Sequence, residues 1–171
     1  MGKLAFLFPG QGAQVVGMGK DFFDTYDLAK KRFAEADEAL GYSISKLCFE
    51  GPADQLQLTE HTQPAILTVA VIASELLRAE GIEPEIAAGH SLGEYAALVA
   101  AGVLSFQDAV LLVHKRGAYM QEAVPVGEGA MAAVIGLDDE TIVSACAEAS
   151  SVGAVQAVNF NCPGQTVIAG T

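Results

Sequence analysis

The chain has 171 residues, of which 51% are hydrophobic and 18% are charged, enough to bury the core of one domain, or of one domain and part of a second. Nine Lys and Arg against 21 Asp and Glu give a net charge of −12, which argues against a nucleic-acid-binding or anionic-membrane surface. No apolar run is long enough to span a membrane, and the first residues lack the pattern of a signal peptide, so we expect a cytoplasmic protein.

The three cysteines, Cys48, Cys146 and Cys162, are an odd number without CxxC spacing. This pattern argues against a disulfide scaffold and a zinc site, and it fits a reducing compartment. We therefore expect no metal, and we expect all three side chains to be buried as small hydrophobic groups.

The first part of the chain alternates apolar runs with helical patterns. Residues 3–8 predict a buried strand, which Pro9-Gly10 ends, and a glycine-rich loop follows over residues 11–19. The further elements predicted here are a strand over residues 86–89 and helices over residues 20–40, 62–80, 91–101 and 106–122. Pro64 is expected in the first turn of its helix, and Ser105 is expected to cap the last helix.

The pattern changes after Pro125. Strands are predicted over residues 129–137, 155–160 and 165–169, with a helix from the cap Asp138 to Ala149. The order β-α-β-β is the first part of a ferredoxin-like unit. The chain stops at Thr171, directly after a strand, so we expect a truncated or cleaved polypeptide.

The pentapeptide Gly89-His90-Ser91-Leu92-Gly93 matches the pattern G-x-S-x-G. In this pattern a strand turns sharply into a helix, and the glycines avoid clashes between side chains that flank the serine. The turn exposes the hydroxyl at a helix N-terminus, which favours developing negative charge. The apolar strand before the turn and the Ala-rich helix after it favour a nucleophile at Ser91 over an incidental tight turn.

Arg116 is the second candidate residue. In the helix over residues 106–122, an apolar stripe includes Val113, Gly117 and Met120, and Arg116 projects from the shoulder of this stripe. A guanidinium in this place needs an anionic partner. The sequence leaves two readings open: a structural salt bridge, or a bidentate clamp for the carboxylate of a ligand.

Gln11 lies between Gly10 and Gly12, just past the first strand. Loops at the carboxyl ends of strands line the ligand crevice of an open α/β sheet. The backbone N–H groups of Gln11 and Leu92 could therefore form an oxyanion hole. A phosphate-binding loop is rejected because the chain has no G-x-x-x-x-G-K-[ST] motif.

No general base for Ser91 can be named from the residues. His90 adjoins the serine across the turn, so its ring should point elsewhere, and His61 falls in a predicted loop. His114 projects to a different side of its helix from Arg116. We expect each histidine to be structural or solvated.

Five motifs then occur in order along the chain. They are FPGQGAQ at 8–14, TQPA at 62–65, GHSLGE at 89–94, RG at 116–117 with MQ at 120–121, and NFN at 159–161 with PGQ at 163–165. The combination closely resembles the malonyl-CoA:acyl carrier protein transacylases of bacterial fatty acid synthesis, and the likeness covers essentially the whole chain.

The resemblance implies a ping-pong acyl transfer. Ser91 would attack the thioester of malonyl-CoA, and the phosphopantetheine thiol of acyl carrier protein would accept the malonyl group. The CoA thioester is a substrate, and no bound cofactor is expected. The family pattern assigns the oxyanion hole to Gln11 and Leu92 and the malonyl carboxylate to Arg116, which favours the clamp.

The resemblance also assigns substrate contacts to Gln63, His90 and Asn161. It implies an α/β fold with an α/β-hydrolase-like large subdomain and an inserted ferredoxin-like subdomain, both incomplete. Residues 1–125 and 126–171 would be their first parts. The family's catalytic histidine lies beyond the position of Thr171, so we expect the C-terminal remainder of the polypeptide as a partner.

Three alternatives stay open: an inactive fragment of such an enzyme, a serine esterase with the same turn, and a module cut from a larger synthase. The start at Met1, directly before the first strand, favours a stand-alone enzyme. Leu92 favours malonyl over methylmalonyl, because family members that use methylmalonyl often carry Gln there. The carrier protein is acidic in such systems, and Lys115 is a candidate for contact with it.

Overall fold

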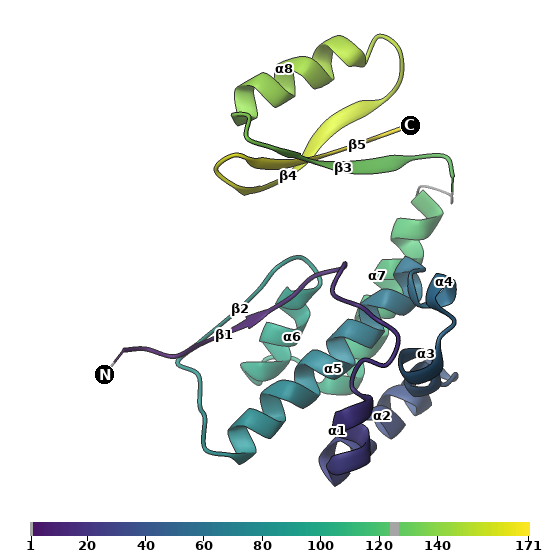
Figure 1. Ribbon diagram of the computed structural model, residues 1–171, viewed down its shortest axis with the longest axis vertical. Helices are drawn as coiled ribbons and strands as arrows, with labels where there is room; N and C mark the ends of the chain where they lie inside the picture. Colours follow the sequence, from purple (N-terminus) through teal and green to yellow (C-terminus); the bar gives the residue numbers. More distant parts are fainter. Residues whose placement is uncertain (1, 124–126) are drawn as a thin grey trace. The chain divides into compact units, whose positions relative to one another are not determined.

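The computed structural model describes residues 2–123 and 127–171 and divides into two compact units, Met1–Gln121 and Glu122–Thr171 (Figure 1). The first part of the chain contains β1 (Ala5–Phe8), α1 (Lys20–Thr25), α2 (Asp27–Leu40), α3 (Ile44–Glu50), α4 (Ala53–Leu56), α5 (Thr59–Ala79), β2 (Ile86–Gly89), α6 (Gly93–Ala100) and α7 (Phe106–Ala123). The second contains β3 (Ala130–Ile135), α8 (Asp139–Ala149), β4 (Val155–Cys162) and β5 (Gln165–Gly170). The predicted boundary between residues 125 and 126 lies outside the described residues.

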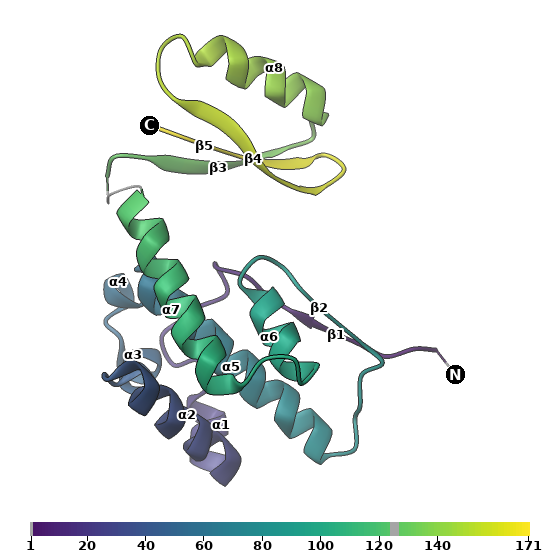
Figure 2. The ribbon, with the colours of Figure 1, turned by 180° about the vertical axis from the view of Figure 1, so that it is seen from behind.

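The first unit is built on two parallel strands and one long helix. Strands β1 and β2 pair in register from Ala5 opposite Ile86 to Phe8 opposite Gly89, so both strands end at the same edge. Helix α6 packs along both strands, and α5 contacts α6 as well as α2, α3 and α4 (Figures 1 and 2). The carboxyl ends of the strands are therefore held close to the start of α6.

The core of this unit lies around α5 and α7. Phe33, Ile44, Leu67, Ile72 and Val110 are fully buried in it, each from a helix with an apolar face. Apolar burial of this kind supplies most of the stability that fixes the helices around the strands.

The predicted strands and the last helix of this unit are confirmed, but two helix boundaries are wrong. The helix predicted over residues 20–40 is interrupted at Tyr26, whose backbone is extended (φ −119°, ψ 126°), because Asp24, Thr25 and Tyr26 are weak helix formers. Helix α5 begins at Thr59, so Pro64 lies inside the helix and not in its first turn.

Three more local features complete the comparison for this unit. Helices α3 and α4 were not predicted. The helix predicted from Ser91 begins at Gly93, because the residues before it form the turn. The cap predicted at Ser105 is confirmed: its hydroxyl accepts from the N–H of Asp108 at 3.1 Å.

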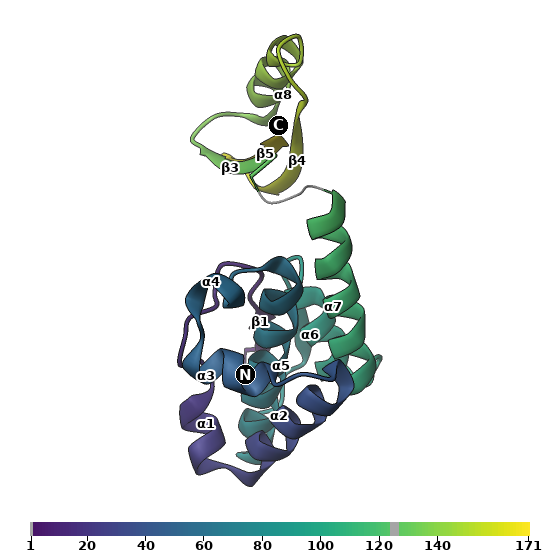
Figure 3. The same cartoon turned by 90° about the vertical axis from the view of Figure 1, so that its right-hand side faces the viewer.

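The second unit is a three-stranded antiparallel sheet in the order β3-β5-β4, with α8 packed on β4 and β5 (Figure 3). Ile142 and Cys146 of α8 are buried, and Asp138 caps the helix by accepting from the N–H of Thr141. The predicted β-α-β-β order and the turn before Gln165 are confirmed.

Two expectations about composition can be compared with these units. Cys48 and Cys146 are buried, but Cys162 is exposed at the end of β4, so the prediction that all three are buried is wrong for Cys162. None of the helices described has the length and apolar character needed to cross a membrane.

Candidate active site

The turn between β2 and α6 holds Ser91 in an unusual backbone conformation. Its φ is +52°, and it is the only non-glycine residue with positive φ among residues 2–123 and 127–171. A left-handed serine is strained and persists only where its surroundings enforce it, which is typical of functional turns. The side chain is exposed, as the G-x-S-x-G pattern predicts.

The two glycines of the motif are enforced by close packing. A Cβ on Gly89 would lie 1.9 Å from the carbonyl carbon of Gly93, and a Cβ on Gly93 would lie 2.2 Å from the carbonyl oxygen of Phe8. The turn is thus pressed against the end of β1 as well as against its own helix. The predicted steric reason for the glycines is confirmed.

The loop after β1 lies beside this turn. The N–H of His90 donates to the carbonyl of Phe8 at 3.1 Å, and a Cβ on Gly10 would lie 2.8 Å from the carbonyl oxygen of His90. Gln11 therefore follows directly on backbone that touches the serine turn. Its side-chain amide donates to the hydroxyl of Thr59 at 3.3 Å.

Leu92 is the residue between Ser91 and the first residue of α6, and its side chain is buried. Its backbone thus lies at the N-terminus of that helix, where amide groups favour an anion. The assignment of the oxyanion hole to the N–H groups of Gln11 and Leu92 stays a prediction.

Arg116 reaches the serine from α7. Its Nη2 donates to the Oγ of Ser91 at 3.0 Å, although 25 residues separate the two along the chain. No carboxylate forms an ion pair with Arg116 within the described part of the chain. The guanidinium is half-buried beside a nucleophile without a structural counter-anion, which supports the clamp over the salt bridge.

Gln63 binds the other terminal nitrogen of the Arg116 guanidinium. It is fully buried in α5; its Oε1 accepts from Nη1 of Arg116 at 2.8 Å, and its Nε2 lies 3.2 Å from the sulfur of Met120. Met120 is 42% exposed and does not belong to the buried stripe in which it was predicted. Gln63 orients Arg116 without neutralising it, so the positive charge stays available to a ligand.

Tyr95 and Thr59 were missed from the sequence. The ring centroid of Tyr95 lies 6.0 Å from Cζ of Arg116, at the outer limit of a cation–π contact. Tyr95 follows Ser91 by four residues, so helical spacing could have placed it on the side of the nucleophile. No sequence signal pairs Thr59 with Gln11.

Two of the three histidines bond to backbone carbonyls. Nδ1 of His61 lies 2.9 Å from the carbonyl oxygen of Gln55, and Nδ1 of His114 lies 3.1 Å from that of Glu60. His61 belongs to α5 and not to a loop. His90 is exposed on the serine turn. The hydroxyl of Ser91 accepts a hydrogen bond from Arg116.

Asn161 lies elsewhere, in β4 of the second unit. Its side-chain amide donates to Oε1 of Gln165 across the hairpin at 3.2 Å. Its predicted contact with substrate stays a prediction.

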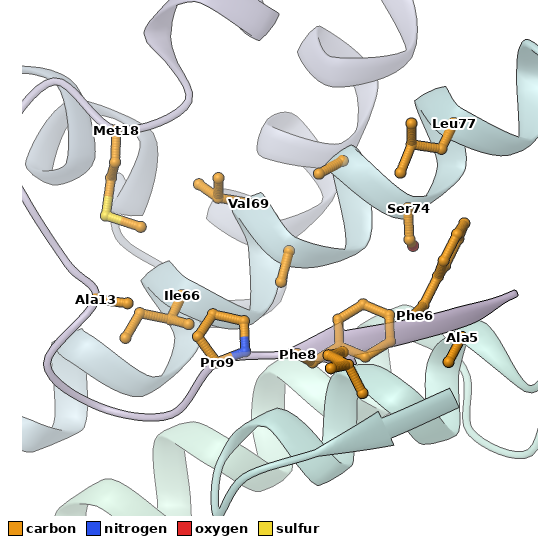
Figure 4. A pocket seen from close by; sticks show the side chains of 13 residues that line it. Ala5, Phe6, Phe8, Pro9, Ala13, Met18, Ile66, Val69, Ser74 and Leu77 are labelled. Carbon is orange, nitrogen blue, oxygen red and sulfur yellow. The ribbon is translucent and has the colours of Figure 1, made fainter. Parts of the chain in front are cut away.

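A cavity of about 400 Å³ is separate from these residues. It lies between β1 and α5 and is mainly apolar, with Phe6 and Phe8 facing Ile66, Val69 and Leu77 (Figure 4). Neither Ser91 nor Arg116 lines it. In the same described part of the chain, no three His, Cys, Asp or Glu side chains form a group that could hold a metal ion.

Comparisons with known proteins identify the family of this chain. Residues 5–171 match the acyl transferase domain family. The chain is 54% identical to the malonyl CoA-acyl carrier protein transacylase of Bacillus subtilis over 172 residues, which cover 100% of this chain and 54% of that protein. The chain thus spans about half the length of the curated relatives it matches.

Solved structures give the same result. The acyl-carrier-protein S-malonyltransferase of Burkholderia pseudomallei matches with a TM-score of 0.90 and 54% identity, over 99% of this chain and 55% of that one. A malonyl-transacylase solved in complex with its type II PKS acyl-carrier protein matches with a TM-score of 0.91 and 48% identity, over 99% and 55%. Both the α/β fold and the sequence of this chain are therefore those of an acyl transferase.

Proposed function

The chain belongs to the acyl transferase domain family, and from this premise we propose that it is the nucleophile-bearing part of a malonyl-CoA:acyl carrier protein transacylase. The observation that carries the proposal is the hydrogen bond from Arg116 to Ser91, which joins a cation without a counter-anion to an exposed serine hydroxyl. An esterase of the same turn type has no need of a cation beside its nucleophile.

The reaction begins at the oxygen of Ser91. This oxygen forms a bond to the thioester carbonyl of malonyl-CoA, the C–S bond breaks, and CoA leaves as the thiol after taking a proton. The sulfur of the carrier protein's phosphopantetheine thiol then bonds to the carbonyl carbon of the malonyl ester, the ester C–O bond breaks, and the proton lost by the thiol restores the serine hydroxyl. The N–H groups of Gln11 and Leu92 stabilise the oxyanion in both steps.

Arg116 selects the acyl group. The free carboxylate of malonyl accepts hydrogen bonds from the guanidinium, which Gln63 keeps in orientation. Fixing this end of the acyl group places the thioester carbonyl at the serine, and a neutral acyl group leaves the guanidinium without its ligand. His90 and Asn161 are proposed as further substrate contacts.

The base is assigned to a longer polypeptide. The relatives are nearly twice the length of this chain, and His61 and His114 each bond a backbone carbonyl instead of Ser91. We assign residues 1–125 to an α/β-hydrolase-like subdomain and residues 126–171 to a ferredoxin-like one, and we expect the remainder to complete both. Turnover therefore requires this remainder as a partner.

Mass spectrometry of the intact chain after mixing with malonyl-CoA tests the acylation step. We expect one malonyl group, mapped by peptide analysis to Ser91, and none on Ser91→Ala. Label that persists on Ser91→Ala would remove Ser91 as nucleophile. A wild-type chain that takes up no label would contradict acylation by this chain without its remainder.

Comparison of malonyl-CoA with acetyl-CoA tests the clamp. Arg116→Ala should slow acylation by malonyl-CoA by roughly tenfold or more, because a charge-assisted pair is lost, and should affect acetyl-CoA much less. Lys115→Ala, which removes the neighbouring positive charge, is the matched control. Equal losses with both thioesters would contradict carboxylate binding by Arg116.

A further inference from the structure

Pro64 leaves a carbonyl of α5 without its usual partner. In an α-helix the N–H of each residue donates to the carbonyl four residues before it, and proline has no N–H. The carbonyl of Glu60 in α5 therefore lacks the donor that any other residue at position 64 would supply. A carbonyl near the protein interior needs another donor.

His114 supplies that donor from another helix. Its Nδ1 lies 3.1 Å from the carbonyl oxygen of Glu60, in a partly buried place. A carbonyl only accepts, so Nδ1 carries the proton. The donor exists in both the neutral Nδ1–H tautomer and the imidazolium ion, so this bond does not depend on protonation of the ring.

The same stretch of α7 also packs closely against α5. A Cβ on Gly117 would lie 2.6 Å from both Cα of Glu60 and the carbonyl oxygen of Thr59, so the two backbones touch there. Glycine permits this contact, but it supplies no side chain that could prevent α7 from rolling on α5.

Two hydrogen bonds oppose such rolling. His114 and Arg116 lie about 160° apart around α7, on opposite shoulders of its buried face. On one shoulder His114 donates to Glu60, and on the other Arg116 donates to Gln63 at 2.8 Å. Since both acceptors belong to the first turns of α5, loss of the first bond leaves the position of Arg116 dependent on the second alone.

We infer that His114 is a positioning residue for Arg116: its ring N–H replaces the amide that Pro64 lacks and fixes the rotation of α7, and with it the distance from the guanidinium to Ser91. The functional part of this inference rests on the carboxylate-binding role proposed for Arg116. The geometric part does not depend on that role.

Three variants distinguish an effect of His114 on the position of Arg116 from an effect on the stability of the fold. His114→Leu removes the donor and keeps an apolar side chain of similar size, whereas His114→Asn retains an N–H close to the place of Nδ1. His61→Leu is the matched control, because His61 also bonds a backbone carbonyl, that of Gln55, and also packs against the ring of Tyr42, but it does not belong to α7.

The primary measurement is the side-chain ¹⁵N–¹H spectrum of the 171-residue chain, with signals of Arg116 and Gln63 assigned by substitution. We expect both signals to shift in His114→Leu, to return toward their wild-type positions in His114→Asn, and to stay unchanged in His61→Leu. Unchanged signals in a folded His114→Leu variant, or equal shifts in His61→Leu, would overturn the inference.

The second measurement is the ratio of Ser91 acylation rates with malonyl-CoA and acetyl-CoA. Misplacement of Arg116 should lower this ratio in His114→Leu by about tenfold and leave it near wild type in His114→Asn. An unchanged ratio together with shifted signals would refute the functional part. If the wild-type chain is not acylated at all, the proposed function fails, and the spectra still decide the geometric part.

Discussion

At the scale of single residues, the backbone around Ser91 holds a strained conformation through close contacts with its neighbours. Its φ of +52° is maintained by the helix that follows and by the end of β1, both within van der Waals contact of the motif glycines. The strain is offset by the packing of the whole first unit. A substitution that adds volume at one of the motif glycines therefore disturbs this packing.

Gly93→Ala should therefore destabilise the chain. The new Cβ would lie 2.2 Å from the carbonyl oxygen of Phe8, so β1 must shift, and we expect a loss of about 3 kcal/mol in the free energy of unfolding. Chemical denaturation measures the loss, with Gly2→Ala as control because a Cβ there meets nothing within 4 Å. Equal stability of the two variants would contradict the close contact.

The sequence alone singled out those residues that a local pattern marks. Ser91 and its glycines follow from five consecutive letters, and Arg116 follows from an odd charge on an apolar stripe. Gln63 and Thr59 were different, because each acts through a partner about 50 residues away. Such pairs depend on how helices cross, which no local pattern in a single sequence specifies.

At the scale of elements, Arg32 joins two helices. Its Nε and Nη2 donate to the two carboxylate oxygens of Glu75 at 2.8 and 2.6 Å, and its Cζ lies 5.1 Å from the ring centroid of Phe106. The bidentate pair connects α2 to α5 beside the start of α7.

Arg32→Ala should cost about 2 kcal/mol of unfolding free energy, because the charge-assisted pairs with Glu75 and Glu35 and the ring contact are lost together. Lys31→Ala is the control: its 3.8 Å pair with Glu35 is exposed on the lysine side, and its loss should cost less than about 1 kcal/mol. Similar costs in the two variants, measured by denaturant unfolding, would show that the pair between α2 and α5 contributes little.

Helix α8 carries a pH-dependent cap. Hydrogen bonds from the backbone N–H of Thr141, then from its hydroxyl, lower the pKa of Asp138 below its ordinary value of 3.8. Because the folded-state pKa is the lower one, the cap stabilises the folded chain at pH values above 3.8, and this contribution is lost as the pH falls through the folded-state value.

Asp138→Asn keeps an acceptor without the charge, so its unfolding free energy should depend less on acid pH than that of the wild type. Lys30 lowers the pKa of Asp27 in both proteins, so the contribution of Asp27 cancels when the pH dependence of the variant is subtracted from that of the wild type. Denaturant unfolding from neutral to acid pH measures the slopes. Parallel curves would contradict a charged cap.

The elements themselves were predicted where capping and turn residues mark their ends. Gly89 and Asp138 each act at the predicted place, and the second unit follows its predicted order throughout. The break at Tyr26 was missed although weak helix formers stand there. The two short helices before Thr59 were missed because their apolar faces acquire meaning only when they pack against α5. Tertiary contacts override weak propensities there.

At the scale of the whole molecule, the two units differ in charge. All nine Lys and Arg precede residue 117, while residues 122–171 contain six Asp and Glu and no positive side chain. Any positively charged surface, including one for an acidic carrier protein, therefore belongs to the first unit. Lys115, exposed beside Arg116, is the candidate for such contact.

Thiol labelling distinguishes buried from exposed parts of the chain. Burial, with the charge of Asp37 as a smaller cause, raises the pKa of Cys48 to about 12, so its reactive thiolate is scarce at neutral pH. We expect iodoacetamide to modify Cys162 alone in the native chain, and Cys48 and Cys146 only in denaturant. Mass spectrometry counts the labels, and a second label without denaturant would contradict the burial described.

The hydrogen bond from Arg116 to Ser91 also affects when the serine can react. A hydroxyl oxygen that accepts a hydrogen bond from a cation is a weaker nucleophile, so this bond lowers the reactivity of Ser91. A ligand carboxylate attracts the same guanidinium more strongly than a neutral hydroxyl does, and its arrival frees the serine. Under the proposed function, binding of a malonyl carboxylate would raise the reactivity of Ser91. A neutral acyl group would bind more weakly and would also leave the serine hydroxyl bonded to Arg116 and less reactive.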